Sequence, residues 1–486
     1  MKLFTRIFAL LLVTILCLGL CSCSDDGESA IIYYGVTDVP NTIDPQTASS
    51  GIELILVRNL YEGLLRQDSS GNIVNGVIDS YTYENNTYTF HISDKAVWSD
   101  GYSLTANDFV YALRRAVDPV TKAPNAACLY SVKGALGVAN GELPTTALGV
   151  TAIDSKTLKI ELINEDENFL YTLTTAICMP CRQSFFEGCV GKYGMSLDTT
   201  LTNGSYKLKK WATENFAMRI TKDAKYTGSF TAKNAAVYFT KNNDLSTLEC
   251  LDKSYIDIAE IFYDDLNSAK QKYTINEIEN TVWVLKFGPQ FTADMKKALI
   301  LAALSDNDSA NIGYNIKVAS SAFPTFFDSG LPPISYHNTE TATYLYSEQL
   351  KTLPNKVFPK TSIEFYGGAA AQNISKKVAG NWQAILGAYI NISPLPYLSQ
   401  PENYDLQIYP IEVSERNIYD YLKQLGYTYT ADTHLSNVQH NIYGGVGSTV
   451  PIAFSSSYFA YSNSLNNVVF NQTNGYIDFS QIVKQN

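Results

Sequence analysis

Basic residues are scarce in this sequence: Lys and Arg number 36 against 47 Asp and Glu, and the formal net charge is −11. Proteins that bind the phosphate backbone carry the opposite balance, so we expect no nucleic-acid partner. Only 17% of the residues are charged, whereas 45% are hydrophobic and 12% aromatic, which excludes an intrinsically disordered chain. At 486 residues, the chain is long enough for roughly two to four domains.

The sequence signatures of catalysis are also missing. There is no G-x-S-x-G, no H-E-x-x-H, no P-loop and no G-x-G-x-x-G after a strand. Adjacent acids such as Asp264-Asp265 are typical of solvated loops rather than of general acid–base pairs. Because these motifs are missing, we do not expect an enzyme. We also expect no bound metal or other cofactor, because the four histidines are scattered: His91, His337, His434 and His440.

Long hydrophobic runs are absent after residue 20, so nothing beyond it predicts a membrane span. Lys2 and Arg6 precede an apolar run, residues 7–20, of the length of a secretory signal. The run ends in Leu20-Cys21-Ser22-Cys23, which resembles a bacterial lipobox with Cys23 as the lipid-modified residue. Cys21 fits less well because Leu20 is bulky for a cleavage position; the alternative is a plain secretory signal.

We therefore predict a signal peptide over residues 1–22, a flexible tether over 23–30, and an extracytoplasmic protein lipid-anchored to the bacterial cell membrane. Without Lys2 and Arg6 the remaining chain has 34 basic and 47 acidic residues, a net charge of −13. Attraction to anionic lipid cannot by itself hold such a chain at the membrane.

Cysteine usage does not predict a disulfide framework. Outside the signal and Cys23, five cysteines remain, an odd number, so at least one thiol stays unpaired. Cys178-Met179-Pro180-Cys181 has the spacing of a redox or zinc half-site, but no second pair follows at ligand spacing. We interpret these residues as small buried side chains.

Local patterns indicate a mixed α and β protein without a short repeat. Strands are expected at residues 31–36, 81–83, 88–92 and 149–162, with a hairpin turn at Asn85-Asn86. Helices are expected at residues 52–65 and 106–117, the second capped by Thr105 and closed by Asp118-Pro119. A further helix, residues 374–386, is expected to bury Trp382 in the core.

Several motifs together resemble the extracytoplasmic solute-binding proteins of peptide ABC transporters, solute-binding protein family 5. The most specific is the W-S-D-G…T-A-x-D-F-V-Y block at residues 97–112, whose Asp100-Gly101 turn and Thr105 helix cap are structural. The similarity extends from about residue 31 to 479. Further matches are the turn at residues 40–45, Asn59-Leu60-Tyr61-Glu62-Gly63-Leu64, Asn203-Gly204-Ser205-Tyr206-Lys207-Leu208, Tyr255-Ile256-Asp257-Ile258 and Met295-Lys296-Lys297-Ala298-Leu299.

One departure from the family pattern affects the ligand site. Oligopeptide binders carry Gly-Trp-x-x-Asp shortly after a Tyr-Asp strand, and that Asp pairs with the α-ammonium group of the ligand. Here Ser414 falls where the Asp is expected. Glu412 or Glu415 could supply a carboxylate from one or two residues away, or both could face solvent on a variable loop.

The resemblance implies an α/β, two-lobed periplasmic-binding-protein-like (class II) fold with an extra inserted domain. The expected N-terminal lobe combines residues 31–50, 193–281 and 456–486, the inserted domain spans 51–192, and the C-terminal lobe spans 282–455. Ligand would bind between lobes that close over it. The candidate ligand-binding residues, carried over by position, are Asp38, Val39, Pro40, Asn41, Asn125, Cys128, Tyr130, Tyr409, Ile411, Glu412, Ser414 and Glu415.

The resemblance also implies partners: a peptide ligand, a membrane permease of an ABC transporter and, through Cys23, the lipid bilayer. A monomer is expected. The missing ammonium-pairing Asp keeps a non-peptide ligand open, such as a nickel chelate or a sugar. An enzyme on the same export signal, or a surface adhesin or signalling relay that has lost transport, are the alternatives from other functional classes.

Overall fold

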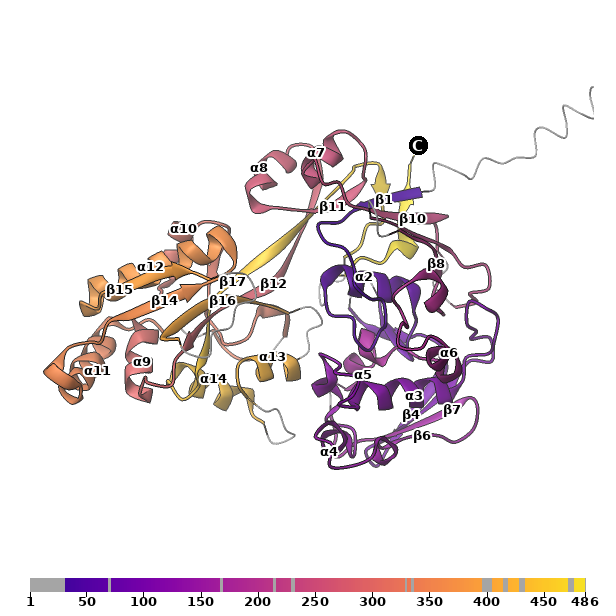
Figure 1. The fold of residues 1–486 in the computed structure, drawn as a ribbon, viewed down its shortest axis with the longest axis horizontal. Coiled ribbons are helices and arrows are strands. Elements are labelled where there is room, and N and C mark those ends of the chain that lie inside the picture. Colours follow the sequence, from indigo (N-terminus) through magenta and orange to yellow (C-terminus); the bar gives the residue numbers. More distant parts are fainter. Residues whose placement is uncertain are drawn as a thin grey trace, which may run out of the picture.

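The computed structural model describes residues 31–68, 71–166, 169–212, 216–228, 232–327, 330–333, 336–395, 404–413, 418–427, 433–470 and 476–485. They form two lobes joined by two long strands (Figure 1). Within this part of the chain, no helix is long and apolar enough to cross a membrane. The predicted signal peptide, Cys23, Ser414 and Glu415 lie outside the described residues.

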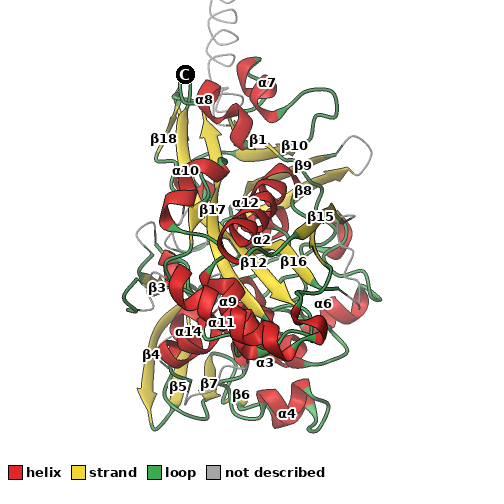
Figure 2. Ribbon diagram, turned by 90° about the vertical axis from the view of Figure 1, so that its left-hand side faces the viewer, coloured by secondary structure: helices red, strands yellow, loops and turns green. Residues whose placement is uncertain are grey.

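One mixed sheet runs through both lobes and forms the frame of the molecule. Its longest strands, β12 and β17, lie side by side and carry the chain between the lobes (Figure 2). In spatial order the strands are β15 (Ile390–Pro394), β14 (Thr361–Phe365), β16 (Leu406–Glu412), β12 (Thr274–Phe287), β17 (Thr449–Tyr461), β11 (Ile258–Ile261), β1 (Ile31–Gly35), β10 (Ala236–Thr240), β9 (Ala217–Lys222) and β8 (Tyr206–Ala212), and β13 (Lys317–Val318) also pairs with β17.

The N-terminal lobe adds smaller sheets and short helices. Its separate four-stranded sheet has the order β4 (Ile78–Glu84), β5 (Thr87–Ile92), β7 (Thr157–Glu161) and β6 (Val150–Ala152), and the paired strands β2 (Leu65–Gln67) with β3 (Ile73–Asn75) and β18 (Leu465–Asn466) with β19 (Val483–Lys484) lie apart from it. The helices are α2 (Gly51–Leu60), α3 (Ala106–Val117), α4 (Ala135–Ala139), α5 (Phe169–Thr172), α6 (Gln183–Gly188), α7 (Thr247–Asp252) and α8 (Leu266–Ala269).

The C-terminal lobe packs helices around β14, β15 and β16. Trp382 is fully buried there and donates from Nε1 to the Leu299 carbonyl at 2.7 Å, so its predicted core role is confirmed. The helices are α9 (Ala293–Leu301), α10 (Ser309–Ile312), α11 (Thr339–Thr352), α12 (Gly368–Leu386), α13 (Ile418–Gln424) and α14 (Leu435–Tyr443). Short 3-10 turns in the two lobes are η1 (Ala126–Leu129), η2 (Thr145–Ala147), η3 (Ala176–Cys178), η4 (Leu197–Thr199), η5 (Tyr263–Asp265), η6 (Asp306–Asp308), η7 (Thr325–Phe327), η8 (Pro354–Lys356) and η9 (Phe479–Gln481).

Each lobe has its own large hydrophobic core, and the cores change over within the two connecting strands. On β12, Ile278 packs in the first core and Val282 in the second. On β17, Phe454 packs in the second core and Phe459 in the first. We call residues 279–281 and 455–457, which lie between these positions, the hinge. Residues 51–192 have a sheet of their own but share the first core with β1, so their expected status as a separate inserted domain stays a prediction.

Several local predictions are confirmed. The helix expected at residues 106–117 is α3, and the Thr105 amide donates to Asp108 Oδ2 at 2.8 Å in a capping box. The expected hairpin turn joins β4 to β5, with both Asn85 and Asn86 at positive φ. Two consecutive left-handed residues give the twist that a two-residue hairpin loop requires.

The helix expected at residues 52–65 is shorter than predicted. It starts with a Ser50 capping box but ends at Leu60, whose carbonyl accepts the amides of Asn203 and Gly204 at 3.2 and 2.9 Å. A Cβ on Gly204 would lie 2.8 Å from the Leu60 carbonyl carbon, so only glycine permits this approach. A distant segment therefore ends the helix, and no local signal marks the position.

Candidate functional site

Strand direction in the N-terminal lobe decides where the segment after β1 lies. β12 runs from the N-terminal to the C-terminal lobe, and β17 runs antiparallel to it. β11 is antiparallel to β17, and β1 is parallel to β11 and to β10. The carboxyl end of β1 therefore points toward the C-terminal lobe.

The corresponding strands of the C-terminal lobe point the opposite way. β16 is antiparallel to β12, and β14 is parallel to both β16 and β15. Their carboxyl ends are therefore directed back toward the N-terminal lobe. Ligands of open α/β sheets bind beyond the carboxyl ends of the strands, and here two such edges face each other across the hinge.

The first predicted segment, residues 38–41, follows β1 at this edge. Asp38 and Asn41 are exposed, whereas the side chain of Pro40 is buried. The Asn41 amide donates to Glu53 Oε1 at 2.9 Å. Because Glu53 is also the capping-box residue of α2, the loop is held by the helix that follows it.

The second predicted segment, residues 125–130, is where the lobes touch away from the hinge. η1 contacts α13 of the other lobe, and Ala127 packs in the core of that lobe. Cys128 is buried in the core of its own lobe, and half-buried Tyr130 contacts both cores. The sequence placed this segment between the lobes, and the packing is consistent with that position.

The third predicted segment lies at the end of β16. Tyr409 is half-buried, whereas the Ile411 side chain belongs to the core of the C-terminal lobe, so only its backbone is available to a ligand. The last residue of β16, Glu412, pairs in the ladder with Thr281 of the hinge. The adjacent Val413 amide donates to the Asn280 carbonyl at 2.8 Å.

Sequence reasoning missed an aromatic group beside Tyr409. The rings of Tyr366 and Tyr409 stack with centroids 5.2 Å apart, and Tyr366 directly follows β14. Gly367 comes next, with a φ of 113°, and a Cβ there would lie 2.9 Å from the indole of Trp283. Burial, with a smaller effect from Tyr366, raises the pKa of Tyr409 to about 12, so its hydroxyl keeps its proton. The Gly367-Gly368 pair after an apolar strand was the available signal.

The hinge carries a hydrogen-bonded connection between its two strands. A β-bulge interrupts the β12–β17 ladder at Asn280, and Asn280 Nδ2 donates to Ser457 Oγ at 3.0 Å. Trp283 Nε1 donates to Ser455 Oγ at 2.8 Å. A bulge weakens regular pairing and bends a strand, so the ladder is interrupted at the point where a relative rotation of the lobes would act.

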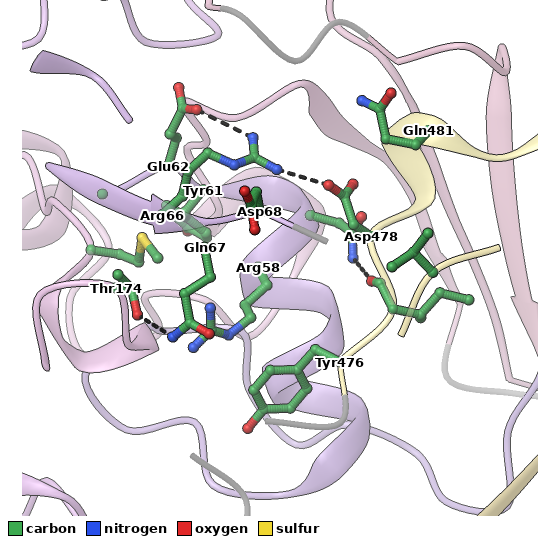
Figure 3. A pocket seen from close by; sticks show the side chains of 15 residues that line it. Arg58, Tyr61, Glu62, Arg66, Gln67, Asp68, Thr174, Tyr476, Asp478 and Gln481 are labelled. Carbon is green, nitrogen blue, oxygen red and sulfur yellow. Dashed lines mark hydrogen bonds and ion pairs between the residues drawn. The ribbon is translucent and has the colours of Figure 1, made fainter. Parts of the chain in front are cut away.

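Three cavities lined by described residues lie within the N-terminal lobe. One of about 230 Å³ has the charged wall shown in Figure 3. Arg66 bridges Glu62 at 3.4 Å and Asp478 at 2.7 Å, and Gln67 donates to Thr174 at 2.8 Å. These contacts join the C-terminal segment to the chain around β2, so the charged groups of this cavity serve to hold the lobe together.

A second charged cluster lies in a groove of about 650 Å³ between the segment after β1 and α3. Arg115 contacts Asp44 with two nitrogens at 2.7 and 3.3 Å and donates to Gln46 Oε1 at 2.7 Å. Its guanidinium also lies 3.9 Å from the ring centroid of Phe186. The fold therefore fixes the loop after β1 onto α3 through a buried ion pair.

The cysteine prediction is confirmed for burial: Cys178 and Cys181 are both buried. Burial raises the pKa of the Cys181 thiol to about 12, against the opposing effect of Arg115. A protonated thiol is a poor nucleophile and a poor metal ligand. Across the described ranges, no three His, Cys, Asp or Glu side chains gather within reach of one metal ion.

Solved structures share this fold. OppA of Listeria monocytogenes, described as bound to peptide, matches with a TM-score of 0.76 and 18% identity over 95% of this chain and 100% of that one. The unliganded open form of the murein tripeptide-binding protein MppA matches with a TM-score of 0.72 and 20% identity over 94% and 98%. At these identities the likeness shows the two-lobed fold.

Sequence comparison adds relatives and a family to the shared fold. MppA of Escherichia coli is 34% identical over 186 residues, covering 38% of this chain and 34% of that protein, and the dipeptide-binding protein of Lactococcus lactis is 26% identical over 270 residues, covering 54% and 49%. The region aligned in sequence thus spans about a third of the length of MppA. The family model described as "Bacterial extracellular solute-binding proteins, family 5 Middle" matches residues 72–433. That match covers well over half of the chain, which therefore belongs to the family 5 extracellular solute-binding proteins of bacteria.

Proposed function

We propose that this protein captures peptides between its two lobes and delivers them to the membrane permease of an ABC transporter. The observation that carries the proposal is the strand topology, which directs the carboxyl ends of β1 and β16 toward each other across the hinge. Relatives named for oligopeptide, dipeptide and murein-peptide binding support it.

The edges suit an extended ligand of variable sequence. A peptide backbone pairs with strand-like segments, while its side chains enter roomy pockets. The Tyr366–Tyr409 stack offers an aromatic wall with a neutral hydroxyl on Tyr409. Closure about the hinge would bring this wall toward the loop that contains Asp38 and complete the site.

We further propose that a carboxylate on one of the facing edges pairs with the ligand's α-ammonium group. Exposed Asp38 lies after β1, and Glu412 ends β16, with Glu415 following in sequence. A hydrogen bond to a charged partner contributes about 1.5–3 kcal/mol. Blocking the ammonium group should therefore weaken binding about 10- to 150-fold.

The experiment is calorimetric titration with a pool of short free peptides and the same pool N-acetylated. We expect binding of the free pool and a much weaker response to the acetylated pool. Three variants identify the carboxylate that pairs with the ammonium group: Asp38→Asn, Glu412→Gln and Glu415→Gln. In the variant that lacks this carboxylate, the affinities for the free and the acetylated pools become equal. Glu340→Gln, on the exposed start of α11, is the matched control. Heat from a sugar or metal chelate with none from any peptide pool would overturn the proposal.

We also propose that Cys23 carries the lipid anchor and that the protein acts as a monomer. Growth with an alkyne-tagged fatty acid should label the wild-type protein and Cys21→Ala, but not Cys23→Ala. The chain expressed from residue 24 onward should sediment as a monomer. Equal labelling of the two variants, or a stable dimer at micromolar concentration, would contradict these assignments.

A further inference from the structure

The outward face of the N-terminal lobe's sheet combines tyrosines with basic side chains. One cross-strand row consists of Tyr33, Tyr238, Arg219 and Lys210, from β1, β10, β9 and β8. The rings of Tyr33 and Tyr238 stack at 5.4 Å, and the Arg219 guanidinium lies 5.0 Å from the centroid of Tyr238. Tyr33 is 36% exposed, and Lys210 at the end of the row is exposed.

This region is basic in an otherwise acidic protein. Residues 206–241, which span β8, β9 and β10, hold eight Lys and Arg against two acids, a net of +6. With −11 for the whole chain, the remaining residues carry −17. Of the two acids, Asp223 is buried and paired with Lys207 at 3.4 Å. Within the described chain, no ion pair is formed by Lys209, Lys210, Arg219 or Lys222.

Protection of the sheet edge explains only part of this pattern. β8 is the edge strand of the large sheet, and exposed lysines on an edge discourage pairing with other chains, which accounts for Lys209 and Lys210. Arg219 and Lys222 lie on β9, which is paired on both sides. The stacked tyrosines lie further inside the sheet, on β1 and β10.

The position of this face relates it to the proposed lipid anchor. The eight Cα–Cα steps from Cys23 to Ile31 span at most about 28 Å. Because the carboxyl end of β1 points toward the other lobe, its amino end lies on the side away from the ligand edge. The first residue of β1, Ile31, belongs to the adjacent outward row with Lys207.

We propose that this face, formed by Tyr33, Lys207, Lys210, Arg219 and Tyr238, docks on the anionic phosphate headgroups of the membrane that carries the anchor. Tyrosine rings favour the membrane interface, and each Lys or Arg near an anionic surface contributes about 1 kcal/mol. The acid beside this face, Asp257, accepts from the Tyr33 amide at 2.9 Å and is paired with Lys484 at 2.9 Å. Docking rests on the proposed anchor for its strength.

A lysine footprint on vesicles tests the proposal. The chain from Cys23 onward contains every element described here, and its other cysteines are buried, so Cys23 can be coupled to a maleimide lipid. Acetylation of Lys207 and Lys210 is then followed by mass spectrometry on phosphatidylcholine vesicles with and without phosphatidylglycerol. We expect about fivefold slower acetylation with phosphatidylglycerol, the equivalent of ~1 kcal/mol per side chain. Exposed lysines of the C-terminal lobe serve as internal controls: Lys356, Lys360 and Lys376.

Matched variants provide the second readout. In the lipid-coupled chain, Lys210→Gln and Arg219→Gln combined should remove most of the slowing of Lys207 acetylation that phosphatidylglycerol causes. The control combination, Lys356→Gln with Lys360→Gln, should leave that slowing within twofold. Equal slowing of acetylation on the two kinds of vesicle would overturn lipid docking. Equal losses of that slowing in the two variant combinations, or slowing seen only when a permease is present, would also overturn it. Because maleimide supplies the anchor and peptide titration is unaffected by these surface changes, failure here is distinguishable from failure of the proposed function.

Discussion

The buried pair between Arg115 and Asp44 gives the sharpest stability prediction. Arg115 is 9% exposed and Asp44 5%, and two guanidinium nitrogens contact the carboxylate. Arg115→Met keeps much of the apolar stem but leaves the carboxylate with the backbone amide of Gln46, at 3.2 Å, as its hydrogen-bond donor. Removing one partner of a buried ion pair costs about 3–5 kcal/mol.

The assay is urea unfolding at neutral pH, with the free energy of unfolding obtained from midpoint and slope. Asp44→Leu combined with Arg115→Met should recover much of the loss, because no charge then remains buried. Lys272→Met is the matched control: Lys272 contacts Asp252 at 2.8 Å but is 55% exposed, so its loss should be at most about 1 kcal/mol. A loss below about 1 kcal/mol for Arg115→Met would refute the reasoning that burial decides the cost.

Three further predictions concern other parts of the molecule. Trp382→Ala should cost about 3–5 kcal/mol, because it empties a fully buried site and leaves the Leu299 carbonyl unpaired; thermal unfolding checks this, and a small shift would mean that the site collapses. Burial raises the pKa of Glu62. The stabilisation from this group is therefore present below its pKa in the unfolded chain and is lost as the pH rises through its pKa in the folded protein. Glu62→Gln should flatten this decline of stability with pH, and parallel curves of urea midpoint against pH for the variant and the wild type would count against it. Tyr409→Ala should weaken peptide binding while Tyr409→Phe changes it little, because the phenyl ring keeps the stack with Tyr366, and calorimetry showing equal losses in both variants would assign the role to the hydroxyl.

Local signals in the sequence predicted local structure well. Thr105 and Asp108 are three residues apart and form their capping box without help from distant residues. Leu64 continues the helical spacing of α2, yet the helix ends at Leu60, because the Asn203 and Gly204 amides occupy its carbonyl. That partner is more than a hundred residues away, which explains the error.

The same distinction holds for the site. Family motifs located residues after β1 and at the end of β16, and the ladder directions explain why both edges face the hinge. The Tyr366–Tyr409 stack joins residues on two strands that only the sheet brings together. Ile411 was predicted at the site, and it lies on the same face of β16 as Tyr409, but its side chain is buried in the core of the C-terminal lobe.

The central claim is that peptides bind between the lobes. Native mass spectrometry of the chain purified from cells without its signal, followed by denaturation and identification of the released compounds, tests it most directly. The account predicts a series of short peptides of mixed sequence that are bound to the native protein and released on denaturation. A single non-peptide compound released from every preparation would contradict it.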